Sequence, residues 1–80
     1  MSIDEAVFRI YEWQYRPSTT FYCKLLDLIS SSDVDNFNAF KSGFPALIHA
    51  FELWKEVGDD LFRHYNLKVG GEDAGISTKQ

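Results

Sequence analysis

The amino-acid sequence predicts an all-α fold, a small bundle of four helices followed by a disordered C-terminal tail. Apolar residues recur at helical spacing through most of the chain. Proline and glycine stand between these periodic segments, at Pro17, Gly43 and Pro45. Because 80 residues have room for only one hydrophobic core, we expect a single domain over residues 1–67 and a flexible tail over residues 68–80.

The first helix is predicted over residues 3–15. Ser2 and Glu5 fit a capping box, in which each side chain satisfies a backbone donor at the helix start. One face of this helix is formed by Ile3, Val7, Ile10, Tyr11 and Gln14. Pro17 ends the segment, since the residue before proline avoids helical geometry. The β-branched and aromatic residues over 7–15 also fit a strand, but a single strand would have no pairing partner.

The second helix is predicted over residues 20–30 as the central element of the bundle, because it is apolar over most of its circumference. Its apolar stripe is Phe21, Leu25, Leu28 and Ile29, widened by Tyr22, Cys23 and Leu26. The residues available to cap its start are Ser18, Thr19 and Thr20. Three consecutive serines, Ser30 to Ser32, end it.

The third helix is predicted over residues 33–42. Ser32 with Asp35 forms a plausible cap pair, and an acidic first turn complements the helix dipole. We expect Gly43 to close the helix in the left-handed conformation that glycine tolerates.

A long fourth helix is predicted from residue 45 to about residue 66, with Pro45 in its first turn, where proline is tolerated. Its apolar face is Leu47, Phe51, Trp54, Leu61 and Tyr65. This register continues through Gly58, which favours a continuous helix at a cost of about 1 kcal/mol. The alternative is a break at Gly58 and a restart with Asp59 as the cap.

Composition favours a protein of the cytoplasm that does not bind nucleic acid directly. Cys23 is the only cysteine, whereas a small secreted domain usually carries an even number for disulfides. The sequence contains neither a signal-peptide pattern nor an apolar run of the ~18 residues that a membrane span needs. A net charge of −4 disfavours contact with phosphates, which calls for a basic patch.

The sequence gives no indication of an enzyme, a metal site or a cofactor. Cys23 lies on the most apolar predicted helix, where a thiol behaves as a small hydrophobic group. His49 and His64 stand too far apart on one helix to share a metal ion. Asp60 lies four residues before His64, which is the spacing of a helix-stabilising charge pair.

Two groups of residues are candidate partner-binding residues. Glu52, Glu56 and Asp60 follow one another at intervals of four, and Asp59 adjoins them, so a continuous helix would carry an acidic strip. Such a strip suits a protein partner with a basic, nucleic-acid-binding surface; the competing interpretation is a solvated face partly neutralised by Lys55 and Arg63. The second group consists of aromatic rings near the corner between the first two helices, Trp13, Tyr15 and Tyr22, which we expect to be partly exposed.

Three short motifs carry a resemblance to known proteins: Phe21-Tyr22 at the start of the second helix, Asp33 and Asn36 at the start of the third, and Gly43-Phe44-Pro45 at the following turn. Over residues 8–57 the layout resembles small helical proteins of unassigned function encoded by phages and prophages, a group that includes anti-CRISPR proteins. The resemblance implies a small, acidic, non-enzymatic inhibitor of a host nucleic-acid-handling complex. The alternative is a homodimeric structural or assembly protein that acts through exposed aromatic rings.

Overall fold

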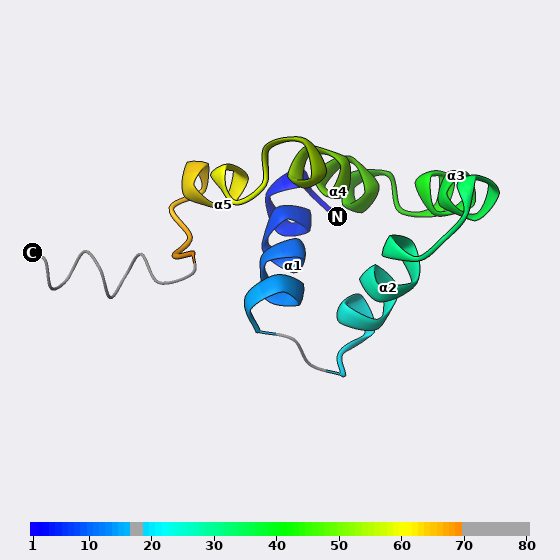
Figure 1. Ribbon diagram of the computed structural model, residues 1–80, viewed down its shortest axis with the longest axis horizontal. Coiled ribbons are helices and arrows are strands. Elements are labelled where there is room, and N and C mark those ends of the chain that lie inside the picture. The colour runs from blue at the N-terminus through cyan, green and yellow to red at the C-terminus, as the bar shows by residue number, and fades with distance from the viewer. Residues whose placement is uncertain (17–18, 70–80) are drawn as a thin grey trace, which may run out of the picture.

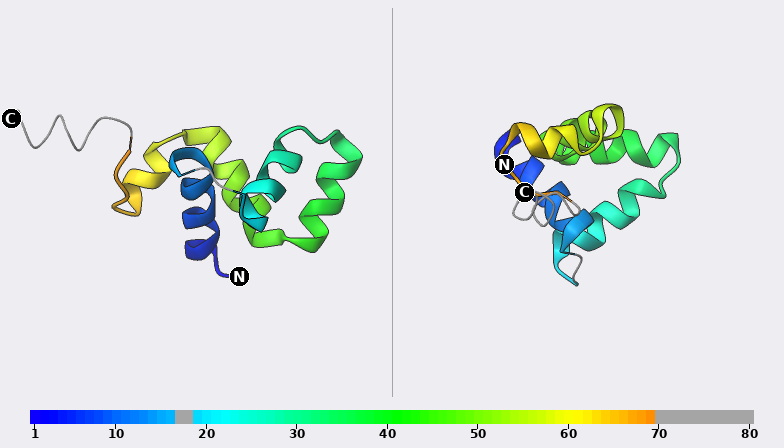
Figure 2. Two further views of the ribbon diagram at one scale, coloured as in Figure 1. Left: turned by 90° about the horizontal axis from the view of Figure 1, so that it is seen from below. Right: turned by 60° about the vertical axis from the view of Figure 1, so that its left-hand side comes forward.

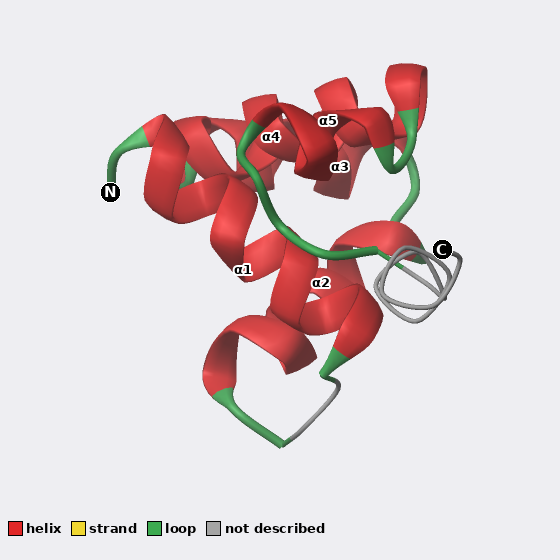
Figure 3. Ribbon diagram, turned by 90° about the vertical axis from the view of Figure 1, so that its left-hand side faces the viewer, coloured by secondary structure: helices red, strands yellow, loops and turns green. Residues whose placement is uncertain are grey.

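The computed structural model describes residues 1–16 and 19–69, and they form five helices. These are α1 (Ile3–Tyr15), α2 (Phe21–Ser30), α3 (Val34–Gly43), α4 (Pro45–Val57) and the short α5 (Asp60–His64) (Figure 1). The described part of the chain holds helices and loops but no strand (Figure 3). The all-α prediction is therefore confirmed, and the alternative of a strand over residues 7–15 is wrong.

The four longer helices form a ring in which each packs against its two neighbours. Backbone contacts join α1 to α2, α2 to α3, α3 to α4, and α4 back to α1, whereas no such contact joins α2 to α4. Figure 2 shows α2 and α3 on the side of the bundle opposite α5. The two central elements are α1, which packs against α2, α4 and α5, and α4, which packs against α1, α3 and α5. The prediction that the second helix is central is wrong.

The second helix is peripheral because one of its faces is left exposed. Phe21 and Leu28, both assigned to its apolar stripe, are 61% and 60% exposed. The face that α2 does bury is formed by Cys23, Leu25, Leu26 and Ile29. Lys24 lies on the exposed side with Phe21 and Leu28, and this polar residue was the available sign that the stripe faces outward there.

One hydrophobic core, to which all helices but α3 contribute buried residues, holds the bundle together. Its largest fully buried side chains are Val7, Ile10, Leu26, Ile29, Leu47, Ile48, Phe62 and Val69. Burying a side chain of this size contributes about 1.5–3 kcal/mol relative to exposing it. Helix α3 has no buried residue and is attached through its half-buried Phe37 and Phe40.

Side-chain caps fix the starts of the first three helices. The backbone N–H of Glu5 donates to Ser2 Oγ at 3.1 Å, which is one half of the predicted capping box, while the Glu5 carboxylate pairs with Arg9 at 3.4 Å. At α2 the cap is Thr20, whose hydroxyl accepts from Cys23 N at 3.4 Å. At α3 the cap is Asp33 rather than the predicted Ser32, since Asp33 Oδ1 accepts from Asn36 N at 2.8 Å.

The turn from α3 to α4 runs through Phe44, which caps both helices. Pro45 occupies the first turn of α4, as predicted. Gly43, by contrast, belongs to α3 and does not have the predicted left-handed conformation, because the one glycine with positive φ among the described residues is Gly58.

The long fourth helix breaks at Gly58, so the prediction of continuity is wrong and the alternative of a break at this glycine is confirmed. Gly58 has φ 64° and ψ −143°, and its N–H completes the last turn of α4 by donating to the Trp54 carbonyl at 2.7 Å. The bend carries Phe62 of α5 onto α1, where its ring centroid lies 5.3 Å from that of Tyr11 and 6.0 Å from that of Tyr15. Burial of Phe62 against α1 therefore outweighs the hydrogen bonds that a continuous helix would keep.

The segment that follows α5 packs onto the core as far as Val69, the last described residue. Asn66 has φ 62° and reverses the chain after α5. The Tyr11 hydroxyl then donates to the Lys68 carbonyl at 2.6 Å, and Val69 is only 1% exposed. The rest of the predicted tail, residues 70–80, lies outside the described residues, as do Pro17 and Ser18.

Among the described residues, no helix combines the length and the apolar character that crossing a membrane would need.

Candidate interaction surfaces

Trp13 is half-buried, and its contacts lie within the chain. Its ring centroid stands 5.4 Å from Trp54 and 6.0 Å from Phe51 on α4. Its Nε1–H donates to Asp27 Oδ1 on α2 at 2.8 Å. Trp13 therefore joins α1 to both neighbouring helices, and its partial exposure agrees with the prediction.

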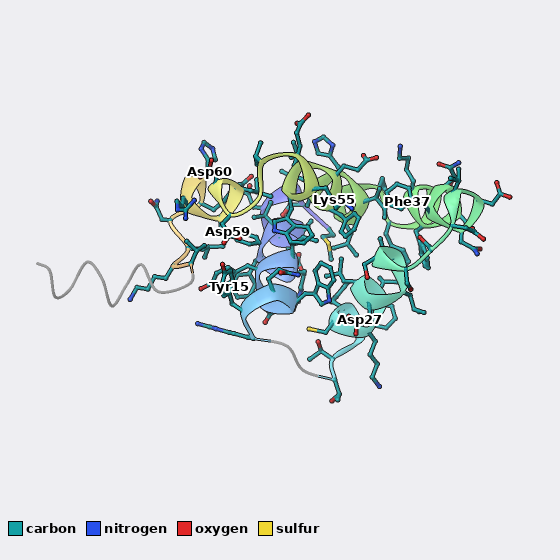
Figure 4. The ribbon with its side chains drawn as sticks, viewed as in Figure 1. Tyr15, Asp27, Phe37, Lys55, Asp59 and Asp60 are labelled. Carbon is teal, nitrogen blue, oxygen red and sulfur yellow. The ribbon has the colours of Figure 1, made fainter. Side chains whose placement is uncertain are left out.

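Tyr15 and Asp59, predicted as members of two separate surfaces, are brought together. The Tyr15 hydroxyl donates to Asp59 Oδ2 at 2.5 Å, and Figure 4 shows the two side chains between the end of α1 and the start of α5. Asp59 precedes α5 but makes no side-chain hydrogen bond to its backbone. It acts as an acceptor that fixes α5 against α1 rather than as a helix cap.

Tyr22 supports a cation–π contact. The Arg9 guanidinium lies 4.7 Å from the centroid of the Tyr22 ring, a distance at which such a pair is attractive. Arg9 also pairs with Glu12 at 3.0 Å and with Glu5 at 3.4 Å. The hydrogen bond to Glu12, and the nearby carboxylates, raise the pKa of Arg9 although burial opposes them, so Arg9 is a permanent cation on this face.

The acidic strip of the predicted long helix is divided by the break at Gly58. Glu52 and Glu56 remain one turn apart on the exposed side of α4, and Glu52 pairs with Lys41 of α3 at 3.5 Å. Asp60 belongs to α5 and pairs with Arg63 at 2.6 Å rather than with His64. Figure 4 places Asp59 and Asp60 at the opposite end of the molecule from Phe37.

A groove of about 320 Å³ lies where the end of α2, the start of α3 and the second half of α4 meet. Its lining combines three apolar side chains with four polar ones, namely Ile29, Phe37, Phe51, Ser30, Ser32, Glu52 and Lys55. The Phe37 and Phe51 rings lie 6.1 Å apart, and the Lys55 ammonium group lies 5.9 Å from the Phe51 ring. Figure 4 labels Phe37 on α3 and Lys55 on α4. This arrangement is an apolar floor with a charged rim.

Sequence reasoning included Glu52 in the acidic strip but did not identify the groove. The groove depends on the gap between α2 and α4, and no sequence pattern reports how far apart two helices stand. A usable signal was the composition of α3, in which Phe37 and Phe40 are the only large apolar residues after Val34. A helix with so narrow an apolar face covers its neighbours incompletely.

Among the described residues, no group of three metal-binding side chains gathers at one place. Cys23, the one cysteine of the sequence, is buried, and His49 is exposed on α4. The class that the described residues define is a small all-α protein. No family model, curated protein or solved structure matches it.

Proposed function

We propose that this chain is a small non-enzymatic binding protein whose partner is a protein with a basic surface. The observation that carries the proposal is the groove between α2, α3 and α4, with Phe37 and Phe51 in its floor and Glu52 on its rim. Its volume is at the lower end of the range of about 300–1,000 Å³ for small-molecule sites. A groove of this size therefore suits one or two apolar side chains of a protein better than a large cofactor.

The charge around the groove supports a basic partner. Residues 21–57, which form α2, α3, α4 and their connections, carry five carboxylates and three lysines, a net charge of −2. Glu52 and Glu56 extend the groove along α4 with carboxylates one turn apart. An amphipathic helix could insert an apolar side chain between Phe37 and Phe51. An arginine or lysine beside that side chain would then pair with the carboxylate on the rim of the groove.

A partner of this kind matches the resemblance to small phage-encoded proteins. Nucleic-acid-handling proteins present basic grooves to phosphates, and an acidic protein bound in such a groove would compete with the nucleic acid. We therefore propose an inhibitory role against such a complex in the host cytoplasm. The cytoplasmic location is supported by the cysteine content of the sequence, since Cys23 is its single cysteine.

The test is a capture experiment on lysate with the immobilised protein, with bound proteins identified by mass spectrometry. We expect a basic partner whose retention falls as salt rises, because exposed charge pairs are screened. The double variant Glu52→Lys/Glu56→Lys should reduce retention about tenfold or more, which corresponds to about 1.4 kcal/mol. Asp60→Lys, at the other end of the molecule, is the matched control and should retain the partner.

A second pair of variants tests the apolar floor. Phe37→Ser should weaken retention of the same partner, whereas Val34→Ser, on the same helix but at a residue 75% exposed, should not. Circular dichroism must show that both variants remain helical. Undiminished binding by the double charge variant and by Phe37→Ser would refute the groove as the binding site.

A further inference from the structure

The groove between α2, α3 and α4 differs from a second opening in the charge that it attracts. The second opening is a pocket of about 260 Å³ where the α3–α4 turn meets the start of α2, and its lining includes Tyr22 and Gly43 but no carboxylate. The Arg9 guanidinium already lies 4.7 Å from the Tyr22 ring. The pocket therefore gives an incoming cation no counter-charge, whereas the groove has Glu52 in its lining.

The two serines that line the groove present acceptors rather than donors. The Ser30 hydroxyl donates to the Asp27 carbonyl at 2.8 Å, and the Ser32 hydroxyl donates to the Ile29 carbonyl at 2.7 Å. A hydroxyl has one hydrogen and two lone pairs. Because the hydrogen of each serine is already used within the chain, its oxygen is left to accept from a donor that enters the groove.

Glu52 has acceptor capacity for a second cation. The Lys41 ammonium lies 3.5 Å from its Oε2 atom, and both side chains are about half exposed. A carboxylate has about four lone-pair sites in all, so one such neighbour does not saturate it. A guanidinium can bind a carboxylate through two parallel hydrogen bonds, whereas an ammonium acts as a point charge.

The aromatic floor favours a flat cation over a compact one. The rings of Phe37 and Phe51 lie 6.1 Å apart at an interplanar angle of 50°, and Phe37 is half-buried. A guanidinium is planar, weakly hydrated and able to stack on an aromatic face, whereas an ammonium is strongly hydrated. The Lys55 ammonium, 5.9 Å from the Phe51 ring, shows that a cation reaches this floor, and as an exposed side chain it can move aside.

Planarity, positive charge, five N–H donors and no acceptor occur together in one side chain, that of arginine. We propose that the groove is an arginine-specific subsite. Beside the apolar side chain that enters between the rings, one arginine of the partner helix lies against Phe37 and donates to Glu52 and to at least one of the two serine oxygens. This inference rests on the proposed function, because it names the cation that the groove selects from its basic partner.

The test is a titration of the full chain with helical peptides, followed through backbone amide shifts in NMR spectra. Each peptide is built from alanine and glutamine with about 18 residues, long enough to be helical in isolation. It carries one central leucine and one variable residue four positions later, which is arginine, lysine, citrulline or glutamate. The arginine peptide should bind about fivefold or more tighter than the lysine peptide. It should also bind more tightly than the citrulline peptide, which has the shape of arginine without its charge, and the glutamate peptide should bind most weakly.

Two matched variants of α4 assign the preference to the groove. Glu52→Gln should bring the affinity ratio of the arginine and lysine peptides close to one, because the bidentate acceptor is lost. Glu56→Gln removes the carboxylate one turn further along the same helix, which is not part of the lining, and should leave that ratio unchanged. Lys55→Gln should tighten binding of the arginine peptide, because it removes a like charge from the rim.

Four outcomes would overturn the subsite. They are equal affinities for the arginine and lysine peptides, tighter binding of the glutamate peptide, an arginine preference that persists in Glu52→Gln, and no shift with any peptide at millimolar concentration. Failure of the proposed function is a different result, in which the Glu52/Glu56 charge variant and Phe37→Ser leave capture of the lysate partner undiminished. A partner that is lost on these variants, together with peptides that bind alike, would retain the groove as the binding site and reject only its selection of arginine.

Discussion

The Tyr15 hydroxyl, at the last residue of α1, donates its hydrogen bond to Asp59, the residue that precedes α5. The two residues are 44 positions apart in the chain. Their bond fixes the angle at which the chain leaves the Gly58 break, and so it positions Phe62 over α1.

Replacing Tyr15 by Phe should lower the free energy of unfolding by about 1–2 kcal/mol, because Asp59 loses a partly buried donor. Urea unfolding followed by the fluorescence of Trp13 and Trp54 measures it. A double-mutant cycle with Asp59→Asn isolates the coupling between the two side chains. A coupling near zero would mean that the bond does not stabilise the fold.

Substitution of two glycines by alanine should have opposite effects. Gly58→Ala should destabilise the protein by about 1–3 kcal/mol, since φ 64° and ψ −143° suit almost no other residue. Gly43→Ala should stabilise it by about 0.5–1 kcal/mol, because Gly43 is helical and has free space beside it. Thermal unfolding at low protein concentration compares them. Stabilisation by Gly58→Ala would indicate that the helix can run straight through.

The packing of residues 65–69, which follow α5, should depend on Tyr11. Tyr11→Phe removes the hydrogen bond to the Lys68 carbonyl and should lower the free energy of unfolding by about 1 kcal/mol. Faster amide exchange should be confined to residues 65–69.

Val69→Ala should lower the free energy of unfolding by roughly 2 kcal/mol, because two methyl groups are lost and a cavity is left. A variant ending at residue 67 should be less stable than one ending at residue 69, because it lacks Lys68 and the buried Val69. Equal stability of the two shortened chains would show that Val69 contributes nothing.

Stability should fall at alkaline pH through Tyr65. Burial and a hydrogen bond with Asp4 raise the pKa of this tyrosine above its ordinary value of about 10. A raised pKa means that the folded state favours the neutral phenol. The contribution of Tyr65 to the free energy of unfolding is therefore complete below pH 10 and is lost as the pH rises through the pKa of the folded state. Between pH 9 and about 11.5, the free energy of unfolding should therefore fall more steeply with pH for the wild type than for Tyr65→Phe. Parallel curves for the two proteins would contradict this assignment.

The sequence predicted the helices well because their signals are local. Ser2 caps α1, Pro45 opens α4, and the apolar spacing of Val7, Ile10 and Tyr11 marks a buried face. The two glycines were assigned the wrong roles because composition does not distinguish a helical glycine from a left-handed one. That distinction was decided by Phe62, whose burial against α1 is a contact between distant parts of the chain.

The candidate site was predicted less completely. Partial exposure of Trp13, Tyr15 and Tyr22 followed from the excess of aromatic residues in a small domain, and it is what the structure has. Their internal partners, such as Asp27 for Trp13, depend on how the helices pack. The outward side of Phe21 was missed because the predicted stripe on α2 was drawn too wide.

Helix α3 forms a wall of both openings, since Phe37 lines the groove and Gly43 lines the pocket. It also has no buried residue, and elements with so little buried apolar surface open at the lowest free energy. Two ligands that both require α3 to be in place share the cost of ordering it. Occupancy of the groove should therefore tighten the binding of any ligand that fills the pocket, and by thermodynamic reciprocity that ligand should tighten the groove's hold on its partner by the same factor.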